Sequence, residues 1–189
     1  MMEHDIDVTG EELYRRYKAG DTDVFEKLVD LYKDDLSSFI YGIVHDYHES
    51  KQLTVETFAR LAVNNNFAGR SSLKTYLFAI AKNLAIRYLK MRKSKQYISY
   101  EEITDVLIDE ADSVINIVER DDDRRYVQDA MKDLKDEYST VLYLLYFEDM
   151  SYIQAGKVMN RSVKQITDLA YRAKLALKKK LESGGFKYV

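Results

Sequence analysis

The sequence contains no cysteine, no proline and no tryptophan, and it has only seven glycines among its 189 residues. Without cysteine the chain can form neither a disulfide framework nor a thiolate metal site. A β-sandwich needs many turns, and turns are rich in the proline and glycine that this chain lacks. Leucine, lysine, glutamate and alanine are plentiful, and they favour helices. We therefore predict an all-α fold.

Long apolar runs and the common catalytic motifs are also missing. No segment approaches the roughly 18 apolar residues that a membrane-spanning helix needs. Residues 1–7 are acidic and lack the apolar run of a signal peptide. We expect a cytoplasmic protein outside the membrane. A glycine-rich phosphate loop, a Gly-x-Ser-x-Gly motif and a His-Glu-x-x-His motif are all absent, so we expect no enzyme activity, cofactor or metal.

The net charge of −3 conceals a strong segregation of charge along the chain. Residues 70–95 contain eight basic and no acidic residues, and residues 124–189 contain 13 basic and eight acidic ones. Between them, residues 96–123 contain ten acidic residues and one basic residue. Two basic stretches predict two surfaces that bind a polyanion, and the acidic stretch predicts a flexible linker that avoids nucleic acid. The predicted organisation is a first domain over 9–95, a linker over 96–123 and a second domain over 124–184.

Polar residues at suitable spacing predict the first two helix starts. Thr9 and Glu12 form a capping-box pattern for a first helix. The run from Asp21 to Asp23 is expected to cap a longer second helix, because short acidic side chains accept hydrogen bonds from the first turn.

Two further helices are predicted in the first domain. Helical periodicity resumes around Ser50 and ends at residues 64–66, which are all asparagine. After a loop, Ser71 or Ser72 is expected to cap a basic helix. Its predicted core positions are Leu73, Leu77, Ile80, Leu84 and Tyr88.

Two more capping boxes predict a helix-turn-helix near the C-terminus. Ser151 with Gln154 and Ser162 with Gln165 each place a glutamine three residues after a serine. The two starts are 11 residues apart, so the first helix has only about two turns. Asn160 is expected to adopt the left-handed conformation that the intervening turn needs.

The rest of this motif follows from packing. Gly156 lies inside the first helix, where glycine costs about 1 kcal/mol relative to alanine, and we interpret it as allowing close approach of the two helices. An apolar helix from Tyr138 to Tyr146 is expected to support them. The second helix has an apolar stripe that faces the core and a polar side that is presented to DNA. The stripe comprises Val163, Ile166, Ala170, Ala173 and Leu177, and the polar side comprises Lys164, Gln165, Asp168 and Arg172.

The segment from Phe67 to Lys90 resembles the second conserved region of bacterial sigma factors, in particular of the extracytoplasmic-function (ECF) group of the sigma-70 family. The segments 134–152 and 171–174 resemble the fourth region of the same group. A helix-turn-helix alone is weak evidence for this family. The two blocks in this order, with an acidic segment between them, are strong evidence for it.

The resemblance implies a two-domain transcription initiation factor. Its first domain binds the clamp of core RNA polymerase and captures the unpaired minus-ten promoter element. Its second domain reads the duplex minus-thirty-five element, and the polymerase flap is a further expected partner. The implied polymerase contacts are Leu53, Glu56, Thr57, Phe58 and Arg60. The implied minus-ten contacts are Asn66, Arg70, Lys74, Lys82, Asn83, Arg87 and Lys90, and the minus-thirty-five contacts are Ser162, Lys164, Gln165, Asp168 and Arg172.

The minus-ten residues of the basic helix fall on two neighbouring stripes. In the family, the residue matching Asn83 lines the pocket for a flipped base, and an asparagine offers both a donor and an acceptor to a base edge. One stripe carries Asn83, Arg87 and Lys90, and the other carries Lys74, Phe78 and Lys82.

The chain departs from the family pattern in two places. Gln52 and Val55 stand where the polymerase-contact helix usually has Asp and Gln. Residues 167–169 read Thr-Asp-Leu where a Lys-Ser-Arg run is common. Fewer cations weaken phosphate binding, while Asp168 can accept a hydrogen bond from a cytosine amino group. An unusual minus-thirty-five preference, or a weaker dependence on that element, is therefore expected. The family also implies an anti-sigma partner, often anchored in the membrane.

Two other functions fit the same residues. One is a two-domain helix-turn-helix regulator that acts without core polymerase, and the other is a sigma-like interaction protein. Either is favoured if the helix around Leu53 to Arg60 proves inert towards polymerase. His45 and His48 have a spacing that metal sites use, but they lack a third ligand nearby and read as surface residues. The adjacent Asp121 to Asp123 would point in different directions on a helix.

Overall fold

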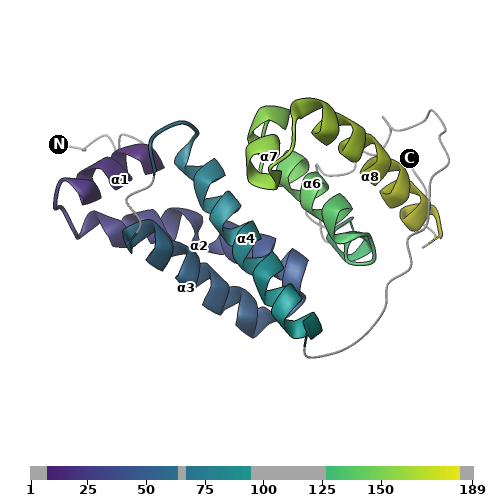
Figure 1. Cartoon of the computed structure of the whole chain (residues 1–189), viewed down its shortest axis with the longest axis horizontal. Helices are drawn as coiled ribbons and strands as arrows, with labels where there is room; N and C mark the ends of the chain where they lie inside the picture. Colours follow the sequence, from purple (N-terminus) through teal and green to yellow (C-terminus); the bar gives the residue numbers. More distant parts are fainter. Residues whose placement is uncertain (1–7, 64–66, 95–126, 184–189) are drawn as a thin grey trace, which may run out of the picture. The chain divides into compact units, whose positions relative to one another are not determined.

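The computed structural model describes residues 8–63, 67–94 and 127–183, and every regular element within these ranges is a helix (Figure 1). The predicted all-α fold is confirmed. The chain divides into two compact units, Met1–Ala85 and Ile86–Val189, and each is described by itself. The division falls inside α4, which is continuous over Leu73–Ser94. The predicted linker, residues 96–123, lies outside the described ranges.

Helix α1 spans Gly10–Lys18 and begins where the sequence predicted. Thr9 is its N-cap, and the Oγ1 atom of Thr9 accepts a hydrogen bond from the Glu12 N–H at 3.3 Å. Helix α2 spans Val24–Val44, but the acidic cap predicted for it is wrong. Asp23 already has helical dihedrals (φ −68°, ψ −25°), so its side chain makes no cap hydrogen bond. A capping residue needs an extended backbone to reach the following N–H groups.

Helix α3 spans Tyr47–Val63 and starts three residues earlier than expected from Ser50. Asp46 provides the start, because its Oδ1 atom accepts a hydrogen bond from the Glu49 N–H at 3.0 Å. The preceding His45 ends α2 in the left-handed conformation, at φ 53°. At the start of α4, Ser72 rather than Ser71 is the cap, since its Oγ atom accepts a hydrogen bond from the Thr75 N–H at 3.2 Å.

The buried side of α4 differs from the predicted stripe. Leu73, Leu77 and Leu84 are buried as expected, whereas Ile80 and Tyr88 are only half-buried. Phe78 was placed with the DNA-facing lysines, and this is wrong. Its side chain is fully buried, and its ring centroid lies 5.0 Å from that of Phe39 in α2. The core of this unit also includes Leu28, Leu36, Ile40, Leu61, Ala81 and Ala85.

The second unit contains a helical segment at residues 127–131, then α6 (Asp136–Tyr146), α7 (Tyr152–Met159) and α8 (Val163–Ser183) (Figure 1). The predicted supporting helix is confirmed as α6, which begins two residues before Tyr138 and packs on both α7 and α8. Near its C-terminal end α8 is joined to the turn that follows the first segment, because Lys180 Nζ lies 2.7 Å from the Asp133 carboxylate. The core residues shared by these helices are Val141, Leu144, Val158, Ile166, Leu169, Ala173 and Leu177.

Candidate nucleic-acid and polymerase interfaces

Both capping boxes of the helix-turn-helix are present. Ser151 N–H donates to Gln154 Oε1 at 2.8 Å, and Gln154 N–H donates to Ser151 Oγ at 3.3 Å. The second box repeats this exchange, with Ser162 N–H to Gln165 Oε1 at 2.9 Å and Gln165 N–H to Ser162 Oγ at 3.2 Å. Each box satisfies two N–H groups that a helix start would otherwise leave without partners. The first turns of α7 and α8 are thereby fixed.

The turn between α7 and α8 is held by two residues. Asn160 adopts the left-handed conformation (φ 54°, ψ 50°) as predicted, and its N–H donates to the Gly156 carbonyl. A Cβ atom on Gly156 would lie 2.7 Å from the carbonyl oxygen of Arg161. The close approach that requires this glycine is therefore mainly to the turn, and less to the facing helix as the sequence suggested. The Arg161 side chain pairs with Glu137, which ties the turn to α6.

The exposed side of α8 agrees with the predicted polar side. Lys164, Gln165, Asp168 and Arg172 are all exposed, and the buried stripe consists of the predicted residues except Val163. Val163, the first residue of α8, is 46% exposed. The sequence stripe also missed Leu169, which is 1% exposed.

Two of the predicted DNA contacts, Ser162 and Gln165, also form the capping box at the start of α8. The acceptor oxygens of Ser162 and Gln165 are engaged in the capping box, so these side chains can offer DNA their O–H and NH₂ donors. Arg172 is held on the same face, with its Nε atom 3.3 Å from the backbone oxygen of Asp168. The face that α8 exposes therefore combines cations, hydrogen-bond donors and one carboxylate.

The basic helix α4 exposes one continuous side. Asn83, Arg87 and Lys90 are all exposed, as the sequence predicted. Two apolar side chains lie among them, Ile86 at 37% and Met91 at 52% exposure. This side thus offers an amide, two cations and apolar surface along two turns of helix, within a stretch free of carboxylates.

The remaining minus-ten candidates differ in position. Lys74 and Lys82 are half-buried, and Lys74 Nζ lies 5.9 Å from the centroid of the Phe78 ring. Arg70 is exposed on the loop before α4, next to Gly69, which has φ 67°. Asn66 lies outside the described residues, so its predicted role stays a prediction.

Three of the five polymerase contacts assigned to α3 are core residues. Leu53, Thr57 and Phe58 are 7%, 0% and 5% exposed. The Thr57 hydroxyl donates to the Leu53 carbonyl at 2.8 Å, so it is already satisfied inside the helix. These three side chains cannot form a docking surface while the first unit is folded. The family motif at these positions is explained by packing against the other helices.

The exposed side of α3 carries different residues. Glu56 and Arg60 are half-buried and form an ion pair, with Arg60 Nη2 at 2.8 Å and Nε at 3.1 Å from Glu56 Oε1. Beside them, Val55 is 69% and Val63 81% exposed, and Ala59 is exposed between them. Spacing of four residues places the three on one stripe. The signal that could have found them is the presence of valines opposite the buried stripe of the same helix.

Known sigma factors are similar to this chain over most of its length. Residues 28–95 match sigma-70 region 2. The ECF RNA polymerase sigma factor SigW of Bacillus subtilis (strain 168) is 28% identical over 180 residues, which cover 88% of this chain and 94% of SigW. These matches support an ECF member of the sigma-70 family. A second ECF sigma factor, SigM of the same organism, is 27% identical over 81% of this chain and 92% of its own. The RNA polymerase sigma-H factor of Pseudomonas aeruginosa is 28% identical over 91% and 93%.

Solved structures of sigma factors share the fold of this chain. CnrH, solved in complex with the cytosolic domain of CnrY, gives a TM-score of 0.67 at 18% identity, over 94% of this chain and 99% of CnrH. RpoE from Bartonella quintana, solved with the anti-sigma factor NepR, gives 0.62 at 18% identity, over 84% and 96%.

The structure also bears on the expectations about membrane spans and about His45 and His48. In the described ranges, none of the helices is both long and apolar enough to cross a bilayer. His48 and Gln52 approach each other, with their Nε2 atoms 2.8 Å apart, and His45 terminates α2. The structure thus gives each histidine a local contact or a helix-ending position. Asp121 to Asp123 lie outside the described residues.

Proposed function

We propose that this protein is an RNA polymerase sigma factor that binds core polymerase and directs promoter recognition, DNA melting and transcription initiation in the bacterial cytoplasm. Its relatives are sigma factors, which are not enzymes. The observation that carries the proposal is the exposed side of α4. It presents Asn83, Arg87 and Lys90 in a chain that also ends in a doubly capped helix-turn-helix.

Helix α4 is proposed to hold the unpaired strand of the minus-ten element. Arg87 and Lys90 supply positive charge to the phosphates, which gives affinity with little dependence on sequence. Asn83 supplies a donor and an acceptor on the same side, so it can bind the edge of a base taken out of the stack. Arg70, on the loop before α4, adds a further cation.

Helix α8 is proposed to read the duplex minus-thirty-five element from the major groove. Lys164 and Arg172 contact phosphates or guanine edges, and Asp168 accepts a hydrogen bond from a cytosine amino group. Val163 is exposed at the first position of the helix, where an apolar side chain can contact the methyl group of thymine. This face has fewer cations than the family pattern, which supports an unusual base preference.

The polymerase surface is proposed to be the exposed side of α3. Val55, Ala59 and Val63 provide the apolar part, and the Glu56–Arg60 pair at its edge fixes the register of docking. Leu53, Thr57 and Phe58, which the sequence suggested as polymerase contacts, are buried and are not part of this surface.

An anti-sigma partner is proposed by analogy. The RpoE structure contains the anti-sigma factor NepR, and the CnrH structure contains the cytosolic domain of CnrY. A partner of this kind, soluble or anchored in the membrane, would cover the same polymerase-binding and DNA-binding faces.

The deciding experiment is run-off transcription. Purified core RNA polymerase and sheared genomic DNA from the source bacterium are incubated with and without this protein. Discrete new transcripts support the sigma factor, and their mapped start sites give both promoter elements. Duplex binding by the chain alone, without new transcripts, supports a regulator that acts without polymerase. Neither transcripts nor DNA binding supports an interaction protein.

Two α4 variants separate base reading from phosphate binding. Asn83→Ala is expected to change the base preference at one minus-ten position, by about tenfold. Arg87→Ala is expected to weaken all sequences alike and to reduce the salt dependence. An Asn83→Ala variant with unchanged preference and unchanged promoter opening contradicts the assignment of Asn83.

A further inference from the structure

The first helix contacts both Phe67 and Leu73, which flank loop residues 68–72 before α4. At the far end, Glu11 Oε1 accepts a hydrogen bond from the Leu73 N–H at 2.7 Å, across 62 residues of sequence. At the near end, the Phe67 ring lies between two tyrosines. Its centroid is 5.5 Å from that of Tyr14 in an edge-to-face arrangement and 5.3 Å from that of Tyr76. Loop residues 68–72, including Arg70, are therefore bracketed by contacts that originate in α1.

The hydrogen bond from Leu73 is made at the positive end of α4. The first N–H groups of a helix have no partner inside the helix, and a carboxylate there also interacts favourably with the helix dipole. Ser72 Oγ accepts the Thr75 N–H, and Glu11 accepts the Leu73 N–H, so the two side chains share the task. One of the two caps of α4 thus comes from a helix distant in sequence.

Helix α1 is itself fixed on its inner side. Gly10 lies directly against Tyr32 of α2, where a Cβ atom would come within 2.1 Å of the Tyr32 hydroxyl oxygen. Leu13 and Tyr14 are each 5% exposed, and Tyr17 packs on Phe25 with ring centroids 4.7 Å apart.

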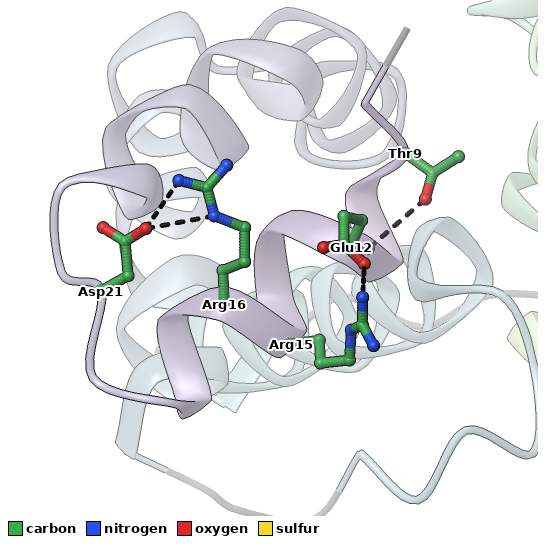
Figure 2. A network of polar contacts seen from close by, with 5 residues as sticks. All are labelled: Thr9, Glu12, Arg15, Arg16 and Asp21. Atoms are coloured by element: carbon green, nitrogen blue, oxygen red, sulfur yellow. Dashed lines mark hydrogen bonds and ion pairs between the residues drawn. The ribbon is translucent and has the colours of Figure 1, made fainter. Parts of the chain in front are cut away.

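Polar contacts also fix α1 at both of its ends (Figure 2). Thr9 caps the start, and Glu12 pairs with Arg15 one turn later. Arg16 reaches across the following turn to Asp21, with Nη2 at 2.7 Å and Nε at 3.1 Å from Asp21 Oδ2. Figure 2 shows these five residues along α1 and the turn that follows it. The Thr9 cap and the Arg16–Asp21 pair thus hold the two ends of the helix that carries Glu11 and Tyr14, whereas the Glu12–Arg15 pair lies within it.

We propose that Glu11 and Tyr14 are positioning residues for promoter capture. They hold the loop Phe67–Ser72 and the first turn of α4 in one conformation before DNA arrives. A loop that is ordered during folding does not have to be ordered on binding, so more of the contact energy appears as affinity. The inference rests on the proposed function, because it assigns a role to α1 in the minus-ten surface.

Electrostatics and positioning predict opposite signs for the loss of Glu11. Removing a negative charge near a DNA-binding loop strengthens the binding of a polyanion if charge alone matters. Removing the contact that fixes the loop weakens it. Glu12 is the matched control, because it lies on the same helix, carries the same charge and pairs with Arg15 of that helix.

The experiment compares Glu11→Ala, Glu11→Gln and Glu12→Ala in holoenzyme reconstituted with core polymerase. The probe is a single-stranded oligonucleotide of the non-template minus-ten strand, taken from a start site mapped by run-off transcription. Glu11→Ala is expected to weaken its binding about fivefold. Glu11→Gln, which keeps an acceptor, restores part of the loss. Glu12→Ala binds as tightly as wild type or slightly more tightly, and duplex minus-thirty-five binding is unchanged in all three.

A second pair of variants tests the aromatic contact. Phe67→Leu keeps apolar volume but removes the ring that Tyr14 and Tyr76 hold, and it is expected to weaken the same oligonucleotide. Phe147→Leu, which makes the same substitution and removes a ring stacked on Tyr143 in the second unit, is the control. Thermal unfolding of each variant is recorded alongside.

Hydrogen exchange tests the structural part independently of DNA. The Leu73 amide is expected to exchange faster in Glu11→Ala than in wild type or Glu12→Ala. Unchanged exchange overturns the inference whatever the DNA binding shows. Glu11→Ala that binds the oligonucleotide as well as wild type, or Glu12→Ala that weakens it equally, also overturns it. Failure of the wild-type holoenzyme to bind the oligonucleotide contradicts the proposed function instead.

Discussion

At the scale of single residues, two helical glycines differ sharply in their surroundings. A Cβ atom on Gly156 would lie 2.7 Å from the backbone oxygen of Arg161, whereas a Cβ atom on Gly42 in α2 would meet nothing within 4 Å. The backbone of a capped turn cannot move aside as a flexible side chain can. The same substitution should therefore have opposite effects at the two positions.

We expect Gly156→Ala to destabilise the second unit by about 1–3 kcal/mol, because the clash outweighs the gain in helix propensity. Gly42→Ala should be neutral or stabilising by up to about 1 kcal/mol. Chemical denaturation of the full chain, followed by helical circular dichroism, measures both. Equal effects of the two substitutions would contradict the steric account of the turn.

Tyr32 makes the stability of the fold depend on pH in the alkaline range. Burial, and then the nearby Glu11 carboxylate, raises the pKa of Tyr32 to about 12. An unfolded tyrosine has a pKa of about 10. Between these values the unfolded chain releases a proton that the folded chain keeps. The stabilisation is therefore complete below pH 10 and is lost as the pH rises towards 12.

The expected loss from Tyr32 across this window is about 2–3 kcal/mol in the free energy of unfolding. Denaturation curves from pH 9.5 to 11.5 for wild type and Tyr32→Phe measure it, since the other tyrosines contribute equally to both. The variant should lose less stability with rising pH. Parallel pH profiles for the two proteins would refute the assignment of this effect to Tyr32.

At the scale of helices, the sequence predicted starts and turns well because their causes are local. A serine followed by a glutamine three residues later satisfies its own helix start, so both boxes were found, as was the left-handed Asn160. The sequence did not predict the second cap of α4. Glu11 lies 62 residues away from Leu73, and only the tertiary fold brings them together.

Which side of a helix is buried was harder to predict, because neighbouring helices decide it. Phe78 lies one residue after Leu77, and both are fully buried, since the core extends beyond a narrow stripe. In α3, the family motif pointed to Leu53, Thr57 and Phe58, which are residues of the core. Motif positions mark both packing and function, and burial is needed to separate them.

The exposed side of α3 leads to a prediction with two arms. Val55→Glu places a charge on the proposed apolar docking surface and should weaken core polymerase binding about tenfold, with little change in stability. Phe58→Ala, a core change, should cost about 3–5 kcal/mol of stability. Competition for core polymerase and thermal unfolding measure the two arms. Unchanged polymerase binding by Val55→Glu would remove α3 from the interface.

At the scale of the whole molecule, the arrangement of charge along the chain matters more than its sum. The ten acidic residues of 96–123 stand between a stretch with eight cations and no acid and a second basic stretch. Charges interact strongly only within about 8–10 Å at physiological salt. We therefore expect an acidic segment joined covalently to both basic stretches to compete with DNA more effectively than equal charge elsewhere.

We expect local competition of this kind to be visible in the free protein. Five linker acids (Glu101, Glu102, Asp105, Asp109 and Glu110) are replaced by amides in one variant. Five exposed acids at the start and along α2 (Asp23, Glu26, Asp30, Asp34 and Asp35) are replaced in the other. Both variants change the net charge from −3 to +2. If net charge alone governs binding, non-specific duplex DNA binds both equally. The linker variant should instead bind it several-fold more tightly than the α2 variant, and the difference should shrink as salt is raised, because salt screens the competition itself.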